Sequence, residues 1–463
     1  MSNEAIEKKL KPFSTTQLLN FCLGFFGLQF AWQMRIILSG PVTEGLGASP
    51  LIFGLIWLAG PVTGMLVQPI IGELSDKTHT VFGKRRPYLF AGALFASLAL
   101  WAFPNSAAIA QKIAELLHMP VPVFGGLIVA AIMIWVIDAC VNAAQGPYRA
   151  LVPDLVPQEQ HSLANAYLSF AIGLGSVVAA GTAPFLKYVC GYQMSINAQF
   201  VMAALAFSLA MLWTCITIKE HKYKKAVEEQ NNEVKKENEP SFMTKVVDFF
   251  KSSPEVGKIC TLQLFTWIGI MSLNIFFTQY ATHTVFNVPD LTSATEEIKN
   301  GYLNLINKST NFSSICFAIQ NLICFVVSIP IGLLSTKFGN KRVHFFSLIT
   351  LALALVGMGI YKEPGFVLIC MAIAGIGWAS VLALPFAMLS EFIKKGSEGS
   401  VMGIFNIFIA GPQVLVCTLL AWAINKCQFM VPEGINYHWE YAFFIGAVTI
   451  LIAAVITNLI KEK

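Results

Sequence analysis

The chain has 463 residues, of which 56% are hydrophobic and 12% charged, with a mean hydropathy of +0.64 and a formal net charge of +5. Soluble domains carry about 25% charged residues. The composition therefore excludes an ordinary soluble protein and favours a helical bundle whose outer surface faces lipid. The ten cysteines show no CxxC pair and no Cys/His metal spacing, so we expect no disulfide, no metal and no cofactor.

Apolar segments of spanning length recur along the chain. A membrane-spanning helix needs about 20 mostly apolar residues, and twelve segments meet that requirement. The sequence therefore predicts an all-α membrane protein with twelve transmembrane helices. The expected spans are 18–39, 51–73, 88–106, 123–146, 162–187, 198–218, 258–285, 311–335, 343–361, 366–390, 401–424 and 440–460.

A polar stretch separates the sixth span from the seventh. It begins at Lys219, is rich in Lys, Glu and Asn, and balances acidic against basic residues, which argues against nucleic-acid binding and for a solvated linker. We expect an N-terminal six-helix half at 1–218, a cytoplasmic linker at 219–257 and a C-terminal six-helix half at 258–463.

The distribution of basic residues predicts the orientation. With the N-terminus in the cytoplasm, the inner segments hold 23 of the 31 Lys and Arg residues and the outer segments hold six. This is the asymmetry of the positive-inside rule. We therefore expect a multi-pass protein of the plasma or inner membrane with both termini cytoplasmic. Only Arg35 and Arg149 remain at membrane depth.

Two loops in corresponding positions of the halves resemble each other. One runs from Gly72 through Ser75 to Gly83, and the other from Gly332 through Ser335 to Gly339. Sorting of positive charge would fill both loops with Lys and Arg, but it does not explain the matched Gly and Ser. The match indicates an internal duplication, which is common in membrane transporters.

These loops also suggest a gate. A carboxylate at a cytoplasmic helix end can pair with basic neighbours and with a helix N-terminus, so such a cluster can hold two halves together and release them. Because Thr336 takes the place of Asp76 in the second copy, we expect the N-terminal half to carry more of the ion pairing. The predicted cytoplasmic gate residues are Gly72, Asp76, Gly83, Lys84, Arg85, Arg86, Lys341 and Arg342.

An acidic residue, Asp138, lies deep in the fourth predicted span. Ionisable groups inside a bilayer are costly and mark functional sites by default. Burial disfavours the charged form of a carboxyl group, so Asp138 could bind and release a proton in a proton-coupled carrier. The alternative is a carboxylate held permanently by an arginine of another helix.

Arg149 follows Asp138 by eleven residues, a rise of about 16 Å on nearly the same helix face. The two side chains cannot touch in a straight helix, but Gly146-Pro147 could break it. From spacing alone, Arg149 is either a ligand in a cavity or an anchor at the cytoplasmic side. Asn142 and Gln145 lie between the two charges and are candidate substrate ligands.

Arg35 lies towards the outer end of the first predicted span. It could extend to the surface, pair with Glu44 or contact a substrate. The amides and the aromatic ring before it suit the binding of sugar rings, although Trp is also common as an interfacial anchor. These candidate substrate ligands are Gln29, Trp32 and Gln33.

Three stretches taken together are specific enough to identify a resemblance. They run from Gly27 through Trp32 to Gly72, from Leu74-Ser-Asp76 to Gly83-Lys-Arg-Arg86-Pro-Tyr, and from Asp138 through Arg149 to Asp154. They resemble the sucrose and maltose proton symporters of the major facilitator superfamily, a group with plant, animal and bacterial members. The resemblance is close over the first half and loose over the second.

The resemblance implies the major facilitator fold and sugar uptake driven by a proton gradient through alternating access. It implies that Asp138 is the proton-coupling carboxyl, and it favours a cavity role for Arg149. The expected partners are a sugar, a proton and the bilayer, with no nucleic acid, and the expected form is a functional monomer. The alternatives are a carrier of the same fold for a pentoside, a hexuronide or an exported drug, and a nutrient sensor that does not transport. An enzyme is not expected, because no HExxH, GxSxG or phosphate loop is present.

Overall fold

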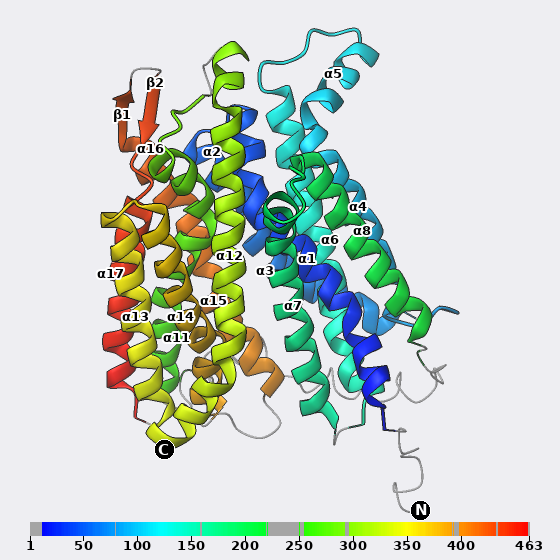
Figure 1. Ribbon diagram of the computed structural model, residues 1–463. Helices are drawn as coiled ribbons and strands as arrows, with labels where there is room; N and C mark the ends of the chain where they lie inside the picture. The colour runs from blue at the N-terminus through cyan, green and yellow to red at the C-terminus, as the bar shows by residue number, and fades with distance from the viewer. Residues whose placement is uncertain are drawn as a thin grey trace, which may run out of the picture. The chain divides into compact units, whose positions relative to one another are not determined.

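Figure 1 shows the computed structural model, which describes residues 12–78, 80–157, 160–218, 220, 250, 254–291, 296–390, 392, 398–431 and 434–461. Within these residues, twelve helices are long and apolar enough to cross a membrane. The prediction of an all-α membrane protein with twelve spans is therefore confirmed. Most of the predicted linker lies outside the described residues.

The chain forms two compact units, and each is described by itself. Unit 1 comprises Met1–Arg35, Thr63–Thr182 and Gly191–Tyr223, and unit 2 comprises Ile36–Val62, Ala183–Cys190 and Lys224–Lys463. Boundaries fall inside α1, α3 and α7, so that the C-terminal part of α1 and the start of α3 belong to unit 2.

Unit 1 contains most of the helices before the linker. They are α1 (Thr15–Gly45), α3 (Ala59–Lys77), α4 (Arg86–Ala102), a short 3-10 helix η2 (Phe103–Asn105), α5 (Ser106–Leu116), α6 (Gly125–Leu155), α7 (His161–Tyr188) and α8 (Ile196–Thr217). Of these, α1, α3 and α7 each continue into unit 2.

Unit 2 contains α2 and the elements after the linker. They are α2 (Pro50–Trp57), α11 (Pro254–Gln279), a π-helix η4 (Tyr280–Val285), α12 (Glu296–Phe338), α13 (Asn340–Ile360), α14 (Pro364–Ser390), α15 (Glu398–Leu415), a π-helix η5 (Val416–Leu420), α16 (Ala421–Lys426), β1 (Gln428–Val431), β2 (Gly434–Tyr437) and α17 (Tyr441–Leu459).

Small residues let the helices of each unit approach closely. In unit 1, a Cβ added at Gly27 would lie 2.5 Å from the Ala206 carbonyl oxygen. In unit 2, a Cβ added at Gly269 would lie 2.8 Å from the Gly446 carbonyl oxygen, where α11 packs on α17. Lipid supplies no hydrophobic force between helices, so close packing of this kind stabilises the bundle.

Helices α6 and α12 are among those that extend beyond their predicted limits. Helix α6 continues through Gly146-Pro147 to Leu155, so the possible break at that dipeptide does not occur. Proline removes one backbone donor, and neighbouring groups in a membrane bundle can compensate for that loss. Helix α12 begins at Glu296 rather than near residue 311, because a search for apolar residues does not detect a polar helical extension.

A small antiparallel hairpin departs from the all-α expectation. Strands β1 and β2 pair in the register Gln428 with Tyr437 and Phe429 with Asn436, next to α16 (Figure 1). The backbone N–H of Asp290 donates to the Ile435 carbonyl over 3.2 Å. The hairpin is thereby joined to the segment that follows η4, within unit 2.

Candidate functional site

An ion pair joins α1 to α6 within unit 1. Arg35 Nη2 donates to Asp138 Oδ2 over 2.5 Å, and the two side chains are 1% and 0% exposed. The Arg35 guanidinium also lies over the Trp32 ring, 5.4 Å from its centroid. Two charges removed from water require each other, because loss of one partner leaves the other buried and uncompensated.

The sequence left open that an arginine of another helix holds Asp138, and the structure shows such a contact, but the identity of that arginine was not found. Arg35 was expected to reach the surface or to pair with Glu44, and both expectations are wrong, since Arg35 pairs with Asp138 and Glu44 bonds His283. The error came from helix length. The predicted first span ends at residue 39, whereas α1 runs to Gly45, which places Arg35 about 15 Å from the end of the helix.

A chain of polar contacts continues one helical turn after Asp138. Asn142 lies on the same face of α6, as expected for a spacing of four residues. Its Oδ1 accepts from Gln68 Nε2 over 2.6 Å, and its Nδ2 donates to Thr63 Oγ1 over 2.9 Å. Both ends of this predicted substrate ligand are therefore engaged with α3, at a point where Gly64 leaves space for the amide.

Arg149 lies two turns further along the same unbroken helix. Its side chain is exposed, and the guanidinium carbon is 5.6 Å from the centroid of the Phe25 ring. Among the described residues, no carboxylate comes within ion-pair distance of it. Arg149 and Asp138 are thus separate charges, one exposed beside an aromatic ring and the other enclosed with Arg35.

The remaining predicted substrate ligands lie near these two charges along α1 and α6. Gln33 is 4% exposed, whereas Gln29, Trp32 and Gln145 are half-buried. Gln29 and Gln33 are four residues apart and share a helix face. Trp32 and Gln33 precede Arg35 by three and two residues, and the Trp32 ring lies beneath its guanidinium.

A second charged cluster lies at the ends of α3, α4 and α6, also within unit 1. Arg85 Nε donates to Asp154 Oδ2 over 2.9 Å, Arg85 Nη2 contacts Asp76, and Lys84 Nζ is 3.5 Å from Asp154. Burial lowers the pKa of Arg85, but the carboxylates of Asp154 and Asp76 outweigh it and raise the pKa. The structure thus brings together the predicted gate residues Asp76, Lys84 and Arg85.

Sequence analysis missed two acidic members of this cluster. One is Asp154. The other is Glu220, whose carboxylate accepts hydrogen bonds from the backbone N–H groups of Lys84, Arg85 and Arg86 at the start of α4. Free N–H groups and the helix dipole make a helix N-terminus a good place for a carboxylate. Glu220 opens the polar linker, so its sequence context indicated only a solvated residue.

The remaining N-terminal gate residues have local roles. Arg86 Nη1 donates to the Ile218 carbonyl over 3.0 Å, and the Gly72 carbonyl accepts from Ser75 Oγ over 2.8 Å. Gly83 has φ 108°, a conformation that other residues rarely adopt. A Cβ at this position would also lie 2.5 Å from Glu220 Oε1.

The loop before α13 repeats this geometry in unit 2. The Gly332 carbonyl accepts from Ser335 Oγ over 2.8 Å, as Gly72 does from Ser75, and Gly339 has φ 88°, matching Gly83. Lys341 Nζ donates to the Ile460 carbonyl over 2.9 Å, whereas Arg85, the residue it matches, pairs with two carboxylates. The two loops therefore share a backbone conformation and differ in the ion pairs that their basic residues make.

Twelve apolar helices, an enclosed ion pair and a duplicated loop define a membrane transporter built from related halves. The chain belongs to the MFS/sugar transport protein family, whose model matches residues 27–294, more than half of its length. The Major Facilitator Superfamily model matches residues 298–462. The family resemblance inferred from the three sequence stretches is thereby confirmed.

Known proteins agree with this assignment. The chain is 26% identical over 424 residues to the sucrose transport protein SUT2 of Oryza sativa subsp. indica, covering 84% of this chain and 83% of that protein. It is 25% identical over 425 residues to the sucrose transport protein SUC4 of Arabidopsis thaliana, covering 84% and 80%.

Solved structures share the fold at low sequence identity. A D-xylose-proton symporter superposes with a TM-score of 0.64 at 14% identity, covering 97% of this chain and 99% of that one. The nucleoside transporter NupG superposes with a TM-score of 0.62 at 11% identity, covering 96% and 99%.

Proposed function

We propose that this protein carries a disaccharide such as sucrose or maltose across the cell membrane together with a proton, by alternating access. The observation that carries the proposal is the enclosed pair of Arg35 and Asp138. A buried carboxylate that is paired with a cation can exchange a proton for an ion pair, which is the chemical step that coupling needs. The names of the related sucrose transport proteins support a sugar as the substrate.

Asp138 is the proposed proton carrier. In its ionised form the carboxylate holds Arg35 through Oδ2, while Oδ1 makes no hydrogen bond to the described residues. A proton on Asp138 removes the negative charge and weakens the ion pair. The guanidinium of Arg35 can then turn its donors towards a sugar oxygen, so that proton and sugar binding support each other.

Arg149 is the second proposed anchor for the sugar. Its guanidinium offers fixed donors and is held by no carboxylate of the described residues, so it can donate to substrate hydroxyls. The half-buried Gln145, Gln29 and Trp32 add amide groups and an aromatic face, and Asn142 and Gln33 complete the proposed set of ligands.

The cluster around Arg85 is proposed as the cytoplasmic gate, with Lys341 and Arg342 as its counterpart in the second copy. The division into six-helix halves at 1–218 and 258–463, joined by the linker, belongs to the same proposal. So do cytoplasmic termini, as the distribution of basic residues favours, and a functional monomer in the plasma or inner membrane.

Uptake into proteoliposomes tests the proposal. Radiolabelled sucrose or maltose should accumulate above its external concentration only when an inward proton gradient is imposed, and a protonophore should abolish the accumulation. Accumulation that is the same with and without the gradient would exclude proton symport. Uptake of neither sugar would exclude sucrose and maltose as substrates and favour a carrier of the same fold for another solute.

A further inference from the structure

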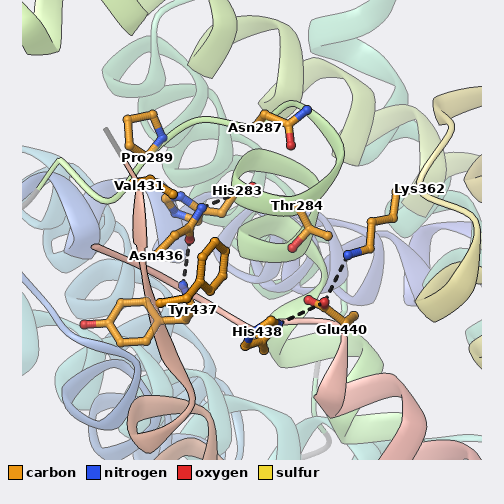
Figure 2. Close-up of a pocket in the computed structure, with 11 residues that line it drawn as sticks. His283, Thr284, Asn287, Pro289, Lys362, Val431, Asn436, Tyr437, His438 and Glu440 are labelled. Atoms are coloured by element: carbon orange, nitrogen blue, oxygen red, sulfur yellow. Dashed lines mark hydrogen bonds and ion pairs between the residues drawn. The ribbon is translucent and has the colours of Figure 1, made fainter. Parts of the chain in front are cut away.

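A recess formed by unit 2 alone shares no residue with the Arg35–Asp138 pair of unit 1. It has a volume of about 490 Å³ and lies between the end of η4, the segment after it and the β1–β2 hairpin. Pockets for small molecules range over about 300–1,000 Å³, so the recess is large enough for a sugar. Figure 2 shows its side chains.

Hydrogen bonds fix the walls of the recess. His283, in η4, contacts Glu44 through Nε2 over 3.1 Å and the Val288 carbonyl through Nδ1 over 2.8 Å. From β2, Asn436 Nδ2 donates to the His283 carbonyl over 3.3 Å. The π-helical turn η4 is itself notable, because such turns occur frequently at functional sites. The recess is therefore a preformed structure.

The charged residues of the recess compensate each other. Glu440 Oε1 lies 3.0 Å from Lys362 Nζ and 3.2 Å from His438 Nδ1. Both contacts are drawn as dashed lines in Figure 2. Burial alone would raise the pKa of Glu440, but hydrogen bonds from the backbone, Lys362 and His438 outweigh it and lower the pKa. Because Glu440 is already paired with Lys362 and His438, the recess suits a neutral ligand better than an ion.

One wall is aromatic. The Phe429 ring lies 4.6 Å from the His438 ring, and the His438 ring stacks on Tyr441 at 4.8 Å. Phe429 is 39% exposed, so part of its face is available to a ligand. The C–H face of a sugar ring packs well against an aromatic surface, which is large, rigid and only weakly hydrated.

Donors and acceptors lie near this wall. The side chains of Thr284 and Asn287 line the recess and make no hydrogen bond to the described residues. Asn287 has φ 54°, a conformation that Asn tolerates and that occurs at ligand sites. An apolar wall with a few placed hydroxyl and amide groups is typical of a site for a polyhydroxylated ligand.

We propose that this recess is a second saccharide-binding site, formed entirely by unit 2 and distinct from the proposed transport site. Phe429 stacks against the sugar ring, and Thr284, Asn287 and Lys362 bond its hydroxyl groups. The choice of sugar rests on the proposed function. With the proposed cytoplasmic termini, the recess opens to the outside, where it would bind sugar before transport.

Photoaffinity labelling tests the site directly. The full-length protein in proteoliposomes is irradiated with a diazirine derivative of sucrose or of maltose, and labelled peptides are mapped by mass spectrometry. We expect labelling within 283–290 or 428–440 that excess unmodified sugar prevents. Labelling confined to other segments, or labelling that excess sugar does not prevent, would overturn the proposal.

Three substitutions make the test specific. Phe429→Ala removes the stacking surface, and Asn287→Gly removes the amide while keeping a residue that accepts the positive φ. Each should raise the sugar concentration needed to prevent half of the labelling about tenfold. Met430→Ala is the control, because Met430 neighbours Phe429 on β1 but points to the opposite face of the strand and is 80% exposed.

The outcomes separate this proposal from the transport proposal. Unchanged competition in both Phe429→Ala and Asn287→Gly, with both proteins eluting as the wild type does on size exclusion, would overturn the second site. Proton-driven uptake without competed labelling in the recess would also overturn it and leave transport standing. Competed labelling without uptake would support the second site and reject the proposed function.

Discussion

The two charged clusters of unit 1 differ in how far their charges are removed from water. Arg35 and Asp138 form a single pair with 1% and 0% exposure. Arg85, which is itself 6% exposed, instead has two carboxylate partners, of which Asp76 is 61% and Asp154 22% exposed. Both charges of the first pair (the closed pair) are enclosed, whereas in the second cluster (the open cluster) a buried arginine is held by two carboxylates that water can reach.

This difference in exposure predicts different roles for the two clusters and different losses of stability when a charge is removed. In the closed pair, a change in one charge leaves the other without compensation, because no water can replace the lost partner. In the open cluster, water and the second carboxylate can compensate. The closed pair is therefore suited to a strict exchange between proton and ion pair, and the open cluster to contacts that form and break repeatedly.

The largest expected effect is that of Asp138→Asn on transport. An amide cannot carry the proton, so we expect the variant to lose accumulation against a sugar gradient and to retain exchange at equal sugar concentrations. Both are measured with radiolabelled sugar in proteoliposomes. Glu73→Gln, which changes an exposed carboxylate next to Lys77, should behave as the wild type. Accumulation by Asp138→Asn at the wild-type level would exclude Asp138 as the coupling group.

The next effect concerns stability. Arg35→Met leaves Asp138 buried without its partner and should lower the free energy of unfolding by about 3–5 kcal/mol. The double variant Arg35→Met with Asp138→Leu removes both charges and should recover most of the stability, but not proton-driven uptake. Thermal unfolding in detergent measures both. If the double variant is no more stable than Arg35→Met, the pair does not behave as a closed unit.

The sequence was sufficient for the fold, because a bilayer requires every backbone group to be bonded within a helix and so leaves a readable apolar pattern. It was also sufficient to single out Asp138 as a buried charge, since a carboxylate in an apolar run stands out. It was not sufficient for Arg35, which lies 103 residues from Asp138. Pairing at that separation depends on the depth and rotation of two helices, and the true length of α1 decides the depth.

The same limit applies at the ends of the helices. Basic residues and glycines marked the loop from Gly72 to Arg86, and Gly83 and Gly339 indeed share a positive φ. The acids that complete the cluster, Asp154 and Glu220, come from separate segments that carry no matching motif. Local backbone geometry leaves a trace in local sequence, whereas contacts between distant segments appear only when the chain is folded.

The smallest expected effect sharpens the comparison at the open cluster. Asp76→Asn removes one partner of Arg85, but Asp76 is 61% exposed and Asp154 remains. We expect a loss of less than about 1 kcal/mol, as for a surface salt bridge. Arg85→Gln removes the guanidinium that Asp76 and Asp154 share and should cost about 1–3 kcal/mol. Thermal unfolding of both variants, beside that of Arg35→Met, provides the measurement.

Arg35→Met, Arg85→Gln and Asp76→Asn can be ranked by the free energy of unfolding that each loses. The ranking tests whether burial of the charge or the number of its carboxylate partners decides the size of that loss. If enclosure governs it, Arg35→Met has the largest effect, although Arg35 contacts Asp138 and Arg85 contacts both Asp76 and Asp154. If the number of partners governs it, Arg85→Gln exceeds Arg35→Met. That second order would contradict the division into a closed and an open cluster, because water would then not be compensating for lost partners at the ends of the helices.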